Sequence, residues 1–216
     1  MFKFHFNYNK DTVYLTLVPD TKKFNIMSTT LIKYLIDFIN ELYDSPVKVL
    51  RIFGEDNSFA VGADIKFMYS MNSFNAKRFS ELANTLFNLL RDIPQVVIAE
   101  IDGYCMGGGL DLAAACDFRF ATKMSKFSHP GAKLGFITGF GGTQRITRIM
   151  KKSYWKHLFF TGDVFDAIQM QEGDFILNTF DSLNEMRHFV DLFTQKISNK
   201  QKHSISLIKE TINNLI

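Results

Sequence analysis

Three successive glycines, Gly107, Gly108 and Gly109, are the residues of this sequence that most clearly indicate a chemical function. They separate the apolar run 96–101, typical of a buried strand, from 110–116, which is rich in strong helix formers. The glycines therefore fall at a predicted helix N-terminus, where unpaired backbone N–H groups and the positive end of the helix dipole converge. Because glycine has no side chain, a ligand can approach these N–H groups, and a developing oxyanion would be stabilised there.

A second turn has the same character and follows the apolar run 47–53. It reads Ser58-Phe59-Ala60-Val61-Gly62-Ala63-Asp64-Ile65-Lys66. Further motifs lie downstream at 116–121 (CDFRFA), 139–145 (GFGGTQR) and 160–163 (FTGD). In this order and at these spacings they resemble the crotonase (enoyl-CoA hydratase/isomerase) superfamily, in register from about Tyr8 to about Asn178. Several separated motifs together are specific, although any one alone would be weak.

The elements that must position these turns can be read from the sequence pattern. Short strands are predicted between 2 and 17 around a turn at 9–11, and Ser28 is a candidate N-cap for the helix that follows it. A helix over 79–91 is ended by Pro94. The remaining predicted elements are a strand over 126–129 and helical periodicity over 186–216.

The resemblance implies an α/β fold, a crotonase-like spiral of strand–strand–helix units with a helical, shortened C-terminal region. We place a crotonase-like core at 1–178 and a C-terminal helical segment, truncated relative to the family, at 179–216. Family members form oligomers, so a homotrimer or hexamer is expected.

Members of this superfamily bind an acyl-CoA thioester and stabilise the enolate-like anion at its carbonyl with two backbone N–H groups. The resemblance assigns these donors to Ala63 and Gly108. The expected function is therefore an acyl-CoA-transforming enzyme of the enoyl-CoA hydratase/isomerase type, active in fatty acid metabolism. Two alternatives stay open: carbon–carbon bond chemistry or hydrolysis on an acyl-CoA, and a non-catalytic CoA-binding or scaffolding subunit.

The acid–base residues depart from the family pattern. Its hydratases use two glutamates, whereas the matching positions here are Asp111 and Gly131. Asp111 keeps a carboxylate and is expected to transfer the proton, with the alternative that it only satisfies the dipole of the helix's first turn. A glycine like Gly131 resembles the pattern of the dihydroxynaphthoyl-CoA synthase branch. Some members of that branch hold a bicarbonate in place of the carboxylate. His129 could instead supply the missing acid or base, since imidazole titrates near neutral pH, or it could be structural.

The resemblance also implies where coenzyme A binds, as part of the substrate and with no tightly bound cofactor. The cations expected near its phosphates are Lys22, Lys23 and Lys66, and the backbone of Phe24 and of 60–62 is expected to hold the adenine and pantetheine. The expected binding set is Lys22, Lys23, Phe24, Ala60, Gly62, Asp64, Ile65 and Lys66. No metal is expected, because His5, His157, His188 and His203 have no metal-ligand spacing with Asp, Glu or Cys.

Composition excludes several other classes of protein. A net charge of +3 on 216 residues does not indicate a nucleic-acid-binding field. The chain lacks an apolar run of about 18 residues, so no membrane span is expected. Its 2 cysteines and the absence of a secretory signal fit a reducing cytoplasm better than a disulfide framework.

Overall fold

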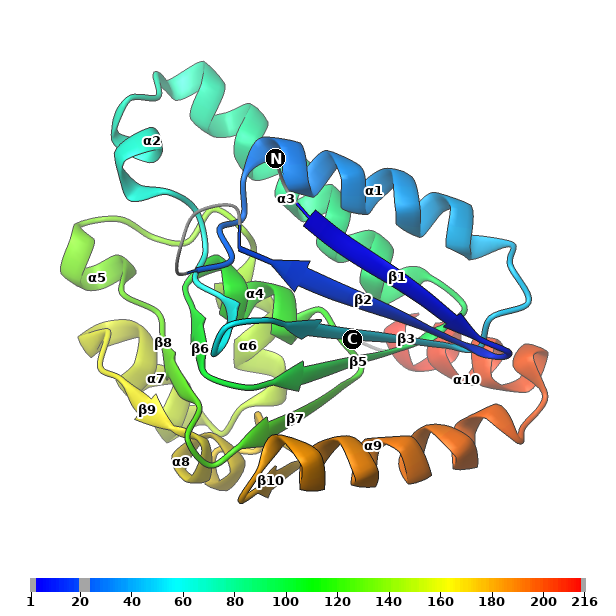
Figure 1. Ribbon diagram of the computed structural model, residues 1–216. Coiled ribbons are helices and arrows are strands. Elements are labelled where there is room, and N and C mark those ends of the chain that lie inside the picture. Colours follow the sequence, from blue (N-terminus) through cyan, green and yellow to red (C-terminus); the bar gives the residue numbers. More distant parts are fainter. Residues whose placement is uncertain (1–2, 20–23, 215–216) are drawn as a thin grey trace.

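Two sheets organise the protein, which we describe from a computed structural model covering residues 3–19 and 24–214. The larger sheet has the strand order β1-β2-β3-β5-β7-β10, and the smaller one has the order β4-β6-β8-β9. Helices surround both sheets (Figure 1). The strands of the larger sheet are β1 (Lys3–Asn9), β2 (Thr12–Val18), β3 (Val49–Gly54), β5 (Val96–Ile101), β7 (Phe118–Thr122) and β10 (Asn178–Phe180). Those of the smaller sheet are β4 (Ser58–Ala60), β6 (Tyr104–Met106), β8 (Lys126–Ser128) and β9 (Phe165–Asp166).

The helices begin where the sequence offers a cap or a turn. Ser28 accepts a hydrogen bond from the Leu31 N–H, as its predicted role as the N-cap of the first helix requires. The helices are α1 (Thr29–Tyr43), α2 (Ile65–Tyr69), α3 (Ser73–Asp92), α4 (Gly108–Ala114), α5 (Gly131–Leu134), α6 (Gly142–Ile149), α7 (Lys152–Thr161), α8 (Ala167–Glu172), α9 (Leu183–Ser198) and α10 (Lys202–Asn214). This alternation confirms the α/β class predicted from the sequence.

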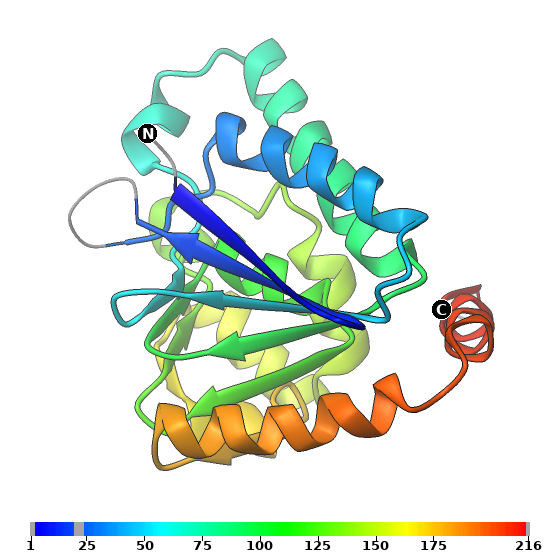
Figure 2. The ribbon, with the colours of Figure 1, turned by 45° about the vertical axis from the view of Figure 1, so that its right-hand side comes forward.

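The six-stranded sheet is parallel except at its first strand. β1 and β2 form the predicted antiparallel hairpin, and β2, β3, β5, β7 and β10 then pair in parallel. Parallel sheets need cover on both faces. Figures 1 and 2 show α1 and α3 on one side of this sheet and α9 on the other. On the α9 side, Met186 and Val190 pack with Val49, Ile98 and Phe120.

The smaller sheet brings segments that are far apart in sequence to one edge. β4 pairs with β6 in parallel, and β6 pairs with β8 in parallel. Because the carboxyl ends of parallel strands meet at the same edge, the residues after Ala60, Met106 and Ser128 become neighbours. Gly103, with a φ of +84°, allows the chain to pass from β5 to β6. A Cβ at Gly103 would overlap the Asn57 backbone, so the close approach requires glycine.

The last helices are joined to the core by both apolar and polar contacts. α10 packs against α3 and β5. Lys209 of α10 is buried, and its Nζ donates to Asp117 Oδ2 at 2.7 Å, to the Gln95 carbonyl at 2.8 Å and to the Leu90 carbonyl at 3.2 Å. The division of the chain into 1–178 and 179–216 stays a prediction.

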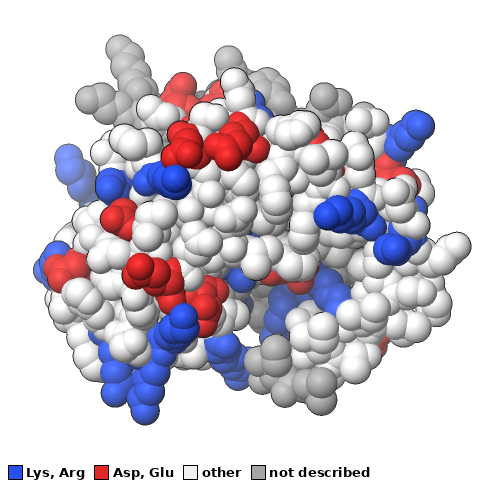
Figure 3. Space-filling view, turned by 90° about the horizontal axis from the view of Figure 1, so that it is seen from below, with Lys and Arg blue, Asp and Glu red and all other residues white. Residues whose placement is uncertain are grey.

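Charges of both signs occur on one face of the molecule (Figure 3). On the face seen from below, Lys and Arg are interspersed with Asp and Glu (Figure 3). Within residues 3–19 and 24–214, no helix is both long and apolar enough to cross a membrane. Cys105 and Cys116 are both buried free thiols.

Candidate active site

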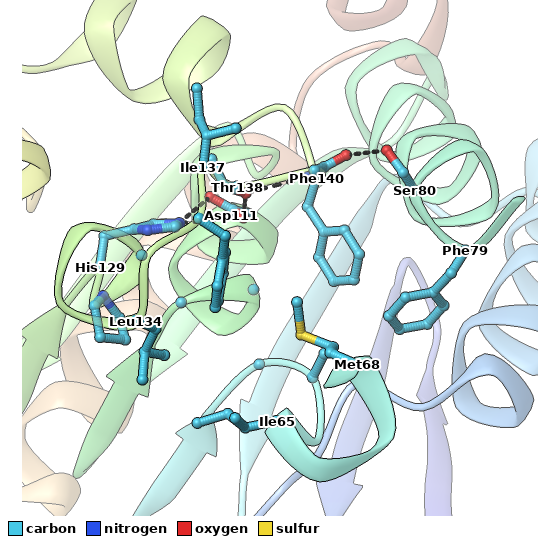
Figure 4. Close-up of a pocket in the computed structure, with 18 of the residues that line it drawn as sticks. Ile65, Met68, Phe79, Ser80, Asp111, His129, Leu134, Ile137, Thr138 and Phe140 are labelled. Atoms are coloured by element: carbon cyan, nitrogen blue, oxygen red, sulfur yellow. Dashed lines mark hydrogen bonds and ion pairs between the residues drawn. The ribbon is translucent and has the colours of Figure 1, made fainter. Parts of the chain in front are cut away.

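A cavity of about 240 Å³ lies at the edge where β4, β6 and β8 end. Its wall includes Gly62 and Ala63 after β4, Gly107 and Gly108 after β6, and the segment 129–131 after β8. Leu134 of α5, residues 136–140 of the loop that follows it, and residues of α2 and α3 complete it (Figure 4). The cavity therefore unites the two turns that the sequence singled out.

The two glycine turns are in direct contact. A Cβ added at Gly62 would lie 2.7 Å from the Gly108 nitrogen, and one added at Gly108 would lie 3.2 Å from the Gly62 Cα. Gly108 is the first residue of α4, so its N–H has no intrahelical acceptor. Within the described residues, the Ala63 N–H makes no backbone hydrogen bond. Two N–H donors thus border one cavity.

Each of the three glycines answers a different local requirement. Gly107 has a φ of +50°, which other residues rarely adopt. A Cβ at Gly108 would lie 2.9 Å from the ring of Phe140, and one at Gly109 would overlap the Ala60 backbone. The run of glycines lets α4 start against β4 with its backbone open to the cavity.

Asp111 lies in the first turn of α4 and is fully buried. Thr138 Oγ1 donates to its Oδ2 at 2.7 Å, and His129 Nε2 lies 3.2 Å from its Oδ1 (Figure 4). Thr138 Oγ1 also accepts the Phe140 N–H at 3.1 Å, which ties the carboxylate to the cavity loop. Gly142 supports the carboxylate from behind, because a Cβ there would overlap Oδ1. The carboxylate is therefore held in one orientation beside the cavity.

His129 follows β8 directly and is 4% exposed. Its ring packs against Phe159 with a centroid separation of 5.0 Å. Both His129 and Asp111 line the cavity, so the buried His–Asp pair faces the space where a ligand would lie.

Gly131 begins α5 and also lines the cavity. A Cβ at this position would lie 2.7 Å from the Phe136 carbonyl oxygen. The backbone of the loop thus occupies the space in which a side chain would begin. Neither a glutamate nor any other side chain fits at this position without a backbone shift.

The rest of the cavity wall is apolar. Phe79 of α3 meets Phe140 edge to face at 5.1 Å, and Phe140 is buried. Ile65 and Met68 project from α2 toward the same space (Figure 4). The Ile, Met, Phe and Leu side chains of the wall are Ile65, Met68, Met71, Phe79, Leu134, Phe136, Ile137 and Phe140.

Of the residues expected to bind coenzyme A, the structure brings only some to the cavity. Gly62 and Ile65 line the cavity, whereas Ala60 is buried in β4. Asp64 is the N-cap of α2 and accepts the Lys66 N–H at 2.8 Å, while the Lys66 side chain is exposed. Phe24 is 38% exposed and meets the ring of Tyr104 at 5.7 Å. Lys22 and Lys23 lie outside the described residues.

Two residues that shape the site, Thr138 and Gly142, were not among the site residues predicted from the sequence. Thr138, which bonds Asp111, carries no local signal, because it lies 27 residues further along the chain. Gly142 belongs to the GFGGTQR motif, but the motif does not show which atom it touches. Among the described residues, no cluster of three or more His, Cys, Asp or Glu side chains could hold a metal ion.

The sequence model of the enoyl-CoA hydratase/isomerase family matches residues 9–215 of this chain. A crotonyl-CoA hydratase from Syntrophomonas wolfei is 38% identical over 148 residues, which are 68% of this chain and 57% of that protein. A short-chain-enoyl-CoA hydratase from Clostridium acetobutylicum is 31% identical over 195 residues, 89% of this chain and 74% of that protein. The crystal structure of an enoyl-CoA hydratase from Bacillus anthracis matches with a TM-score of 0.92 at 26% identity, over 98% of this chain and 82% of that chain.

The chain therefore belongs to the enoyl-CoA hydratase/isomerase family, and the resemblance to the crotonase superfamily and its fold is confirmed. The similarity to the Syntrophomonas wolfei protein spans less than two thirds of that relative's length, at 57%.

Proposed function

We propose that this protein transforms acyl-CoA thioesters by enoyl-CoA hydratase/isomerase chemistry. The observation that carries the proposal is the contact between the Gly62–Ala63 turn and the Gly107–Gly108 turn at one cavity. The thioester oxygen sits between the Ala63 and Gly108 N–H groups, and the enolate formed by reaction at the adjacent carbons places its negative charge there. Removing one such donor from an enzyme typically costs about 3 kcal/mol of transition-state stabilisation.

Asp111 is the carboxylate that takes up a proton in this proposal. It is the acidic side chain among those lining the cavity, and Thr138 and His129 fix its two oxygens. A proton acceptor must lie within reach of the reacting atoms in a fixed orientation, and a carboxylate that is held at both oxygens beside the cavity supports this role for Asp111. Its burial and its two partners favour a catalytic role over simple capping of α4.

The acyl chain of the substrate is apolar. The wall beyond the polar group formed by Asp111, His129 and Thr138 consists largely of Met, Phe, Leu and Ile side chains. An acyl chain with a charged end would lose its hydration there without gaining a partner. The CoA phosphates lie outside the cavity and are bound by the cations Lys66, Lys22 and Lys23, and no tightly bound cofactor takes part.

A second candidate is carbon–carbon bond chemistry or hydrolysis on an acyl-CoA. The feature that favours it is the glycine at position 131, which has no space for the second carboxylate of a hydratase. Both candidates share the oxyanion site and differ in the substrate that turns over. A non-catalytic CoA-binding subunit would need neither a fixed carboxylate nor a buried histidine beside its cavity.

The test combines binding with two reactions. Butyryl-CoA binding is measured by calorimetry, exchange of its α-protons in heavy water by NMR, and hydration of crotonyl-CoA by loss of the enoyl absorbance. The proposal expects binding, exchange and hydration. Turnover of β-keto thioesters without hydration would favour the second candidate. Binding without exchange or turnover of any thioester would identify a binding subunit, and absence of binding at millimolar ligand would refute the proposal.

The proposal includes self-association and a cytoplasmic location. Self-association is supported by exposed apolar side chains on the last two helices, and a trimer or hexamer would cover them. These side chains are Phe189, Leu192, Leu207, Ile208 and Ile212. The location is supported by two buried free thiols, which suit a reducing compartment. Light scattering of the purified protein tests the oligomer, and a monomer at all concentrations would contradict it.

A further inference from the structure

We infer that His129 is the second acid–base catalyst of this site and supplies the proton transfer for which position 131 has no side chain. The inference rests on the proposed acyl-CoA chemistry and assigns a role to one ring nitrogen. Three features carry it: the contact of Nε2 with Asp111, the absence of a hydrogen bond to Nδ1 from any residue that the structure describes, and the backbone that fills the side-chain space of Gly131.

The first feature is the orientation of the ring. Nε2 lies 3.2 Å from Oδ1 and 3.4 Å from Oδ2 of Asp111. The ring also packs on Phe159, and the side chain is 4% exposed. An imidazole that is fixed by a carboxylate at one nitrogen has its other nitrogen available for proton transfer, as in enzymes with a His–Asp pair.

The second feature is the surroundings of Nδ1. Within the described residues, the side-chain hydrogen bonds of His129 involve Nε2 alone. Nδ1 lies 3.7 Å from the point where a Cβ would stand at Gly131. Both residues line the cavity, so Nδ1 borders the region into which a side chain at position 131 would extend.

The third feature is that position 131 cannot regain a carboxylate. A Cβ there meets the Phe136 carbonyl oxygen at 2.7 Å, which is backbone and cannot rotate away. The loop conformation that closes this space also leaves His129 beside the cavity. The site thus contains one carboxylate and one imidazole in place of two carboxylates.

Asp111 and His129 have different roles in hydration, one as proton acceptor and the other as proton donor. An ionised carboxylate can only accept a hydrogen bond or a proton, whereas an imidazolium donates from both nitrogens. Asp111 therefore takes the proton that water loses as the C–O bond forms at the β-carbon. His129 gives its Nδ1 proton to the α-carbon as the C–H bond forms. Asp111 then releases one proton to solvent and His129 takes one up, which restores the pair and balances the reaction.

The experiment compares two His129 variants with a matched control. His129→Ala removes the ring, and His129→Gln keeps a polar side chain of similar length that cannot shuttle a proton. The control is His157→Ala, because His157 also pairs with an aspartate, at 3.0 Å from Asp163, but is 52% exposed and lies outside the cavity. Crotonyl-CoA hydration, butyryl-CoA affinity and thermal unfolding are measured for each, and His129→Ala is also assayed with added imidazole.

We expect both His129 variants to lose about 10²–10⁴-fold in hydration rate, with butyryl-CoA affinity within a few-fold of the wild type. Imidazole should restore activity to His129→Ala but not to His129→Gln, whose side chain fills the space. His157→Ala should match the wild type. Near-normal hydration by His129→Gln would overturn the inference. Equal loss of affinity and folding in both variants would also overturn it, by showing a structural role. A wild-type protein with neither α-proton exchange nor hydration would instead refute the proposed function itself.

Discussion

Gly142 lies so close to Asp111 that a methyl group on its Cα would overlap Oδ1 of the carboxylate. The helix backbone itself would tolerate alanine there, because Gly142 begins α6 and is not among the residues with positive φ. The conflict at this position is therefore with the carboxylate and not with the helix.

We predict that Gly142→Ala displaces the Asp111 carboxylate and lowers crotonyl-CoA hydration by about a hundredfold, since a shift of about 1 Å in a reacting group has that effect. Butyryl-CoA affinity should change little. Gly173→Ala is the control, because Gly173 has a φ of −78° and its Cβ would meet Tyr154 at 3.0 Å, outside the cavity. Equal activity in the two variants would show that the carboxylate position does not matter.

Asp111→Asn tests the carboxylate directly. The amide preserves size and hydrogen bonding but removes basicity. The rate of hydration should therefore fall by at least about 10²–10⁴-fold, which is the typical effect of removing a positioned acid or base. Acyl-CoA affinity should stay within a few-fold of the wild type by calorimetry. Unchanged hydration would exclude Asp111 as the proton acceptor.

Thr138 positions Asp111 without touching the substrate in our account. Thr138→Val keeps the shape but removes the hydroxyl that donates to Oδ2 at 2.7 Å. A hydrogen bond to a charged group contributes about 1.5–3 kcal/mol, so kcat should fall by roughly tenfold to a hundredfold with KM nearly constant. Thr138→Ser restores the hydroxyl and should restore kcat. Equal impairment of the Ser and Val variants would show that the methyl group, and not the hydroxyl, is needed.

The two cysteines should be chemically inert in the folded protein. Burial raises the pKa of Cys116 to about 12, and burial also raises the pKa of Cys105 well above its usual range. For Cys116 this lowers the thiolate fraction at neutral pH by about a thousandfold, and the thiolate is the reactive form. Maleimide should therefore label neither cysteine before unfolding and both in concentrated urea. Rapid labelling of the native protein would contradict this environment.

Lys209 should stabilise the protein by joining α10 to the core. Lys209→Met leaves the partly buried Asp117 carboxylate without its cation, and breaking a buried pair typically costs about 3 kcal/mol. For a protein of this size the melting temperature should fall by about 6–12 °C. The exposed Lys200 gives the control Lys200→Met, which should melt like the wild type. Equal melting of the two variants would show that the Lys209 contacts contribute no net stability.

Local signals in the sequence were sufficient to predict much of the scaffold. The hairpin around 9–11, the Ser28 cap and the glycines at the start of α4 depend on neighbours along the chain, and all are found where they were expected. The smaller sheet was only partly predicted, because strands of two or three residues are too short for a periodic pattern to show.

The geometry of the site depends on contacts that no local pattern encodes. His129 and Asp111 are 18 residues apart and meet because β6 and β8 pair in parallel and end at the same edge. The sequence named both residues as candidates, but it could not show that Nε2 faces the carboxylate or that the Phe136 backbone fills the space at Gly131. The contact at Gly131 follows from the path of the loop 135–141, which lacks a periodic signal of its own.

The most direct test of the account is a crystal structure of the protein with butyryl-CoA bound. The account predicts the thioester oxygen at about 3 Å from both the Ala63 and Gly108 nitrogens, with His129 facing the α-carbon and Asp111 facing the β-carbon of the acyl chain. A thioester bound away from these two N–H groups, or an acyl chain outside the cavity lined by Met68 and Phe140, would contradict it.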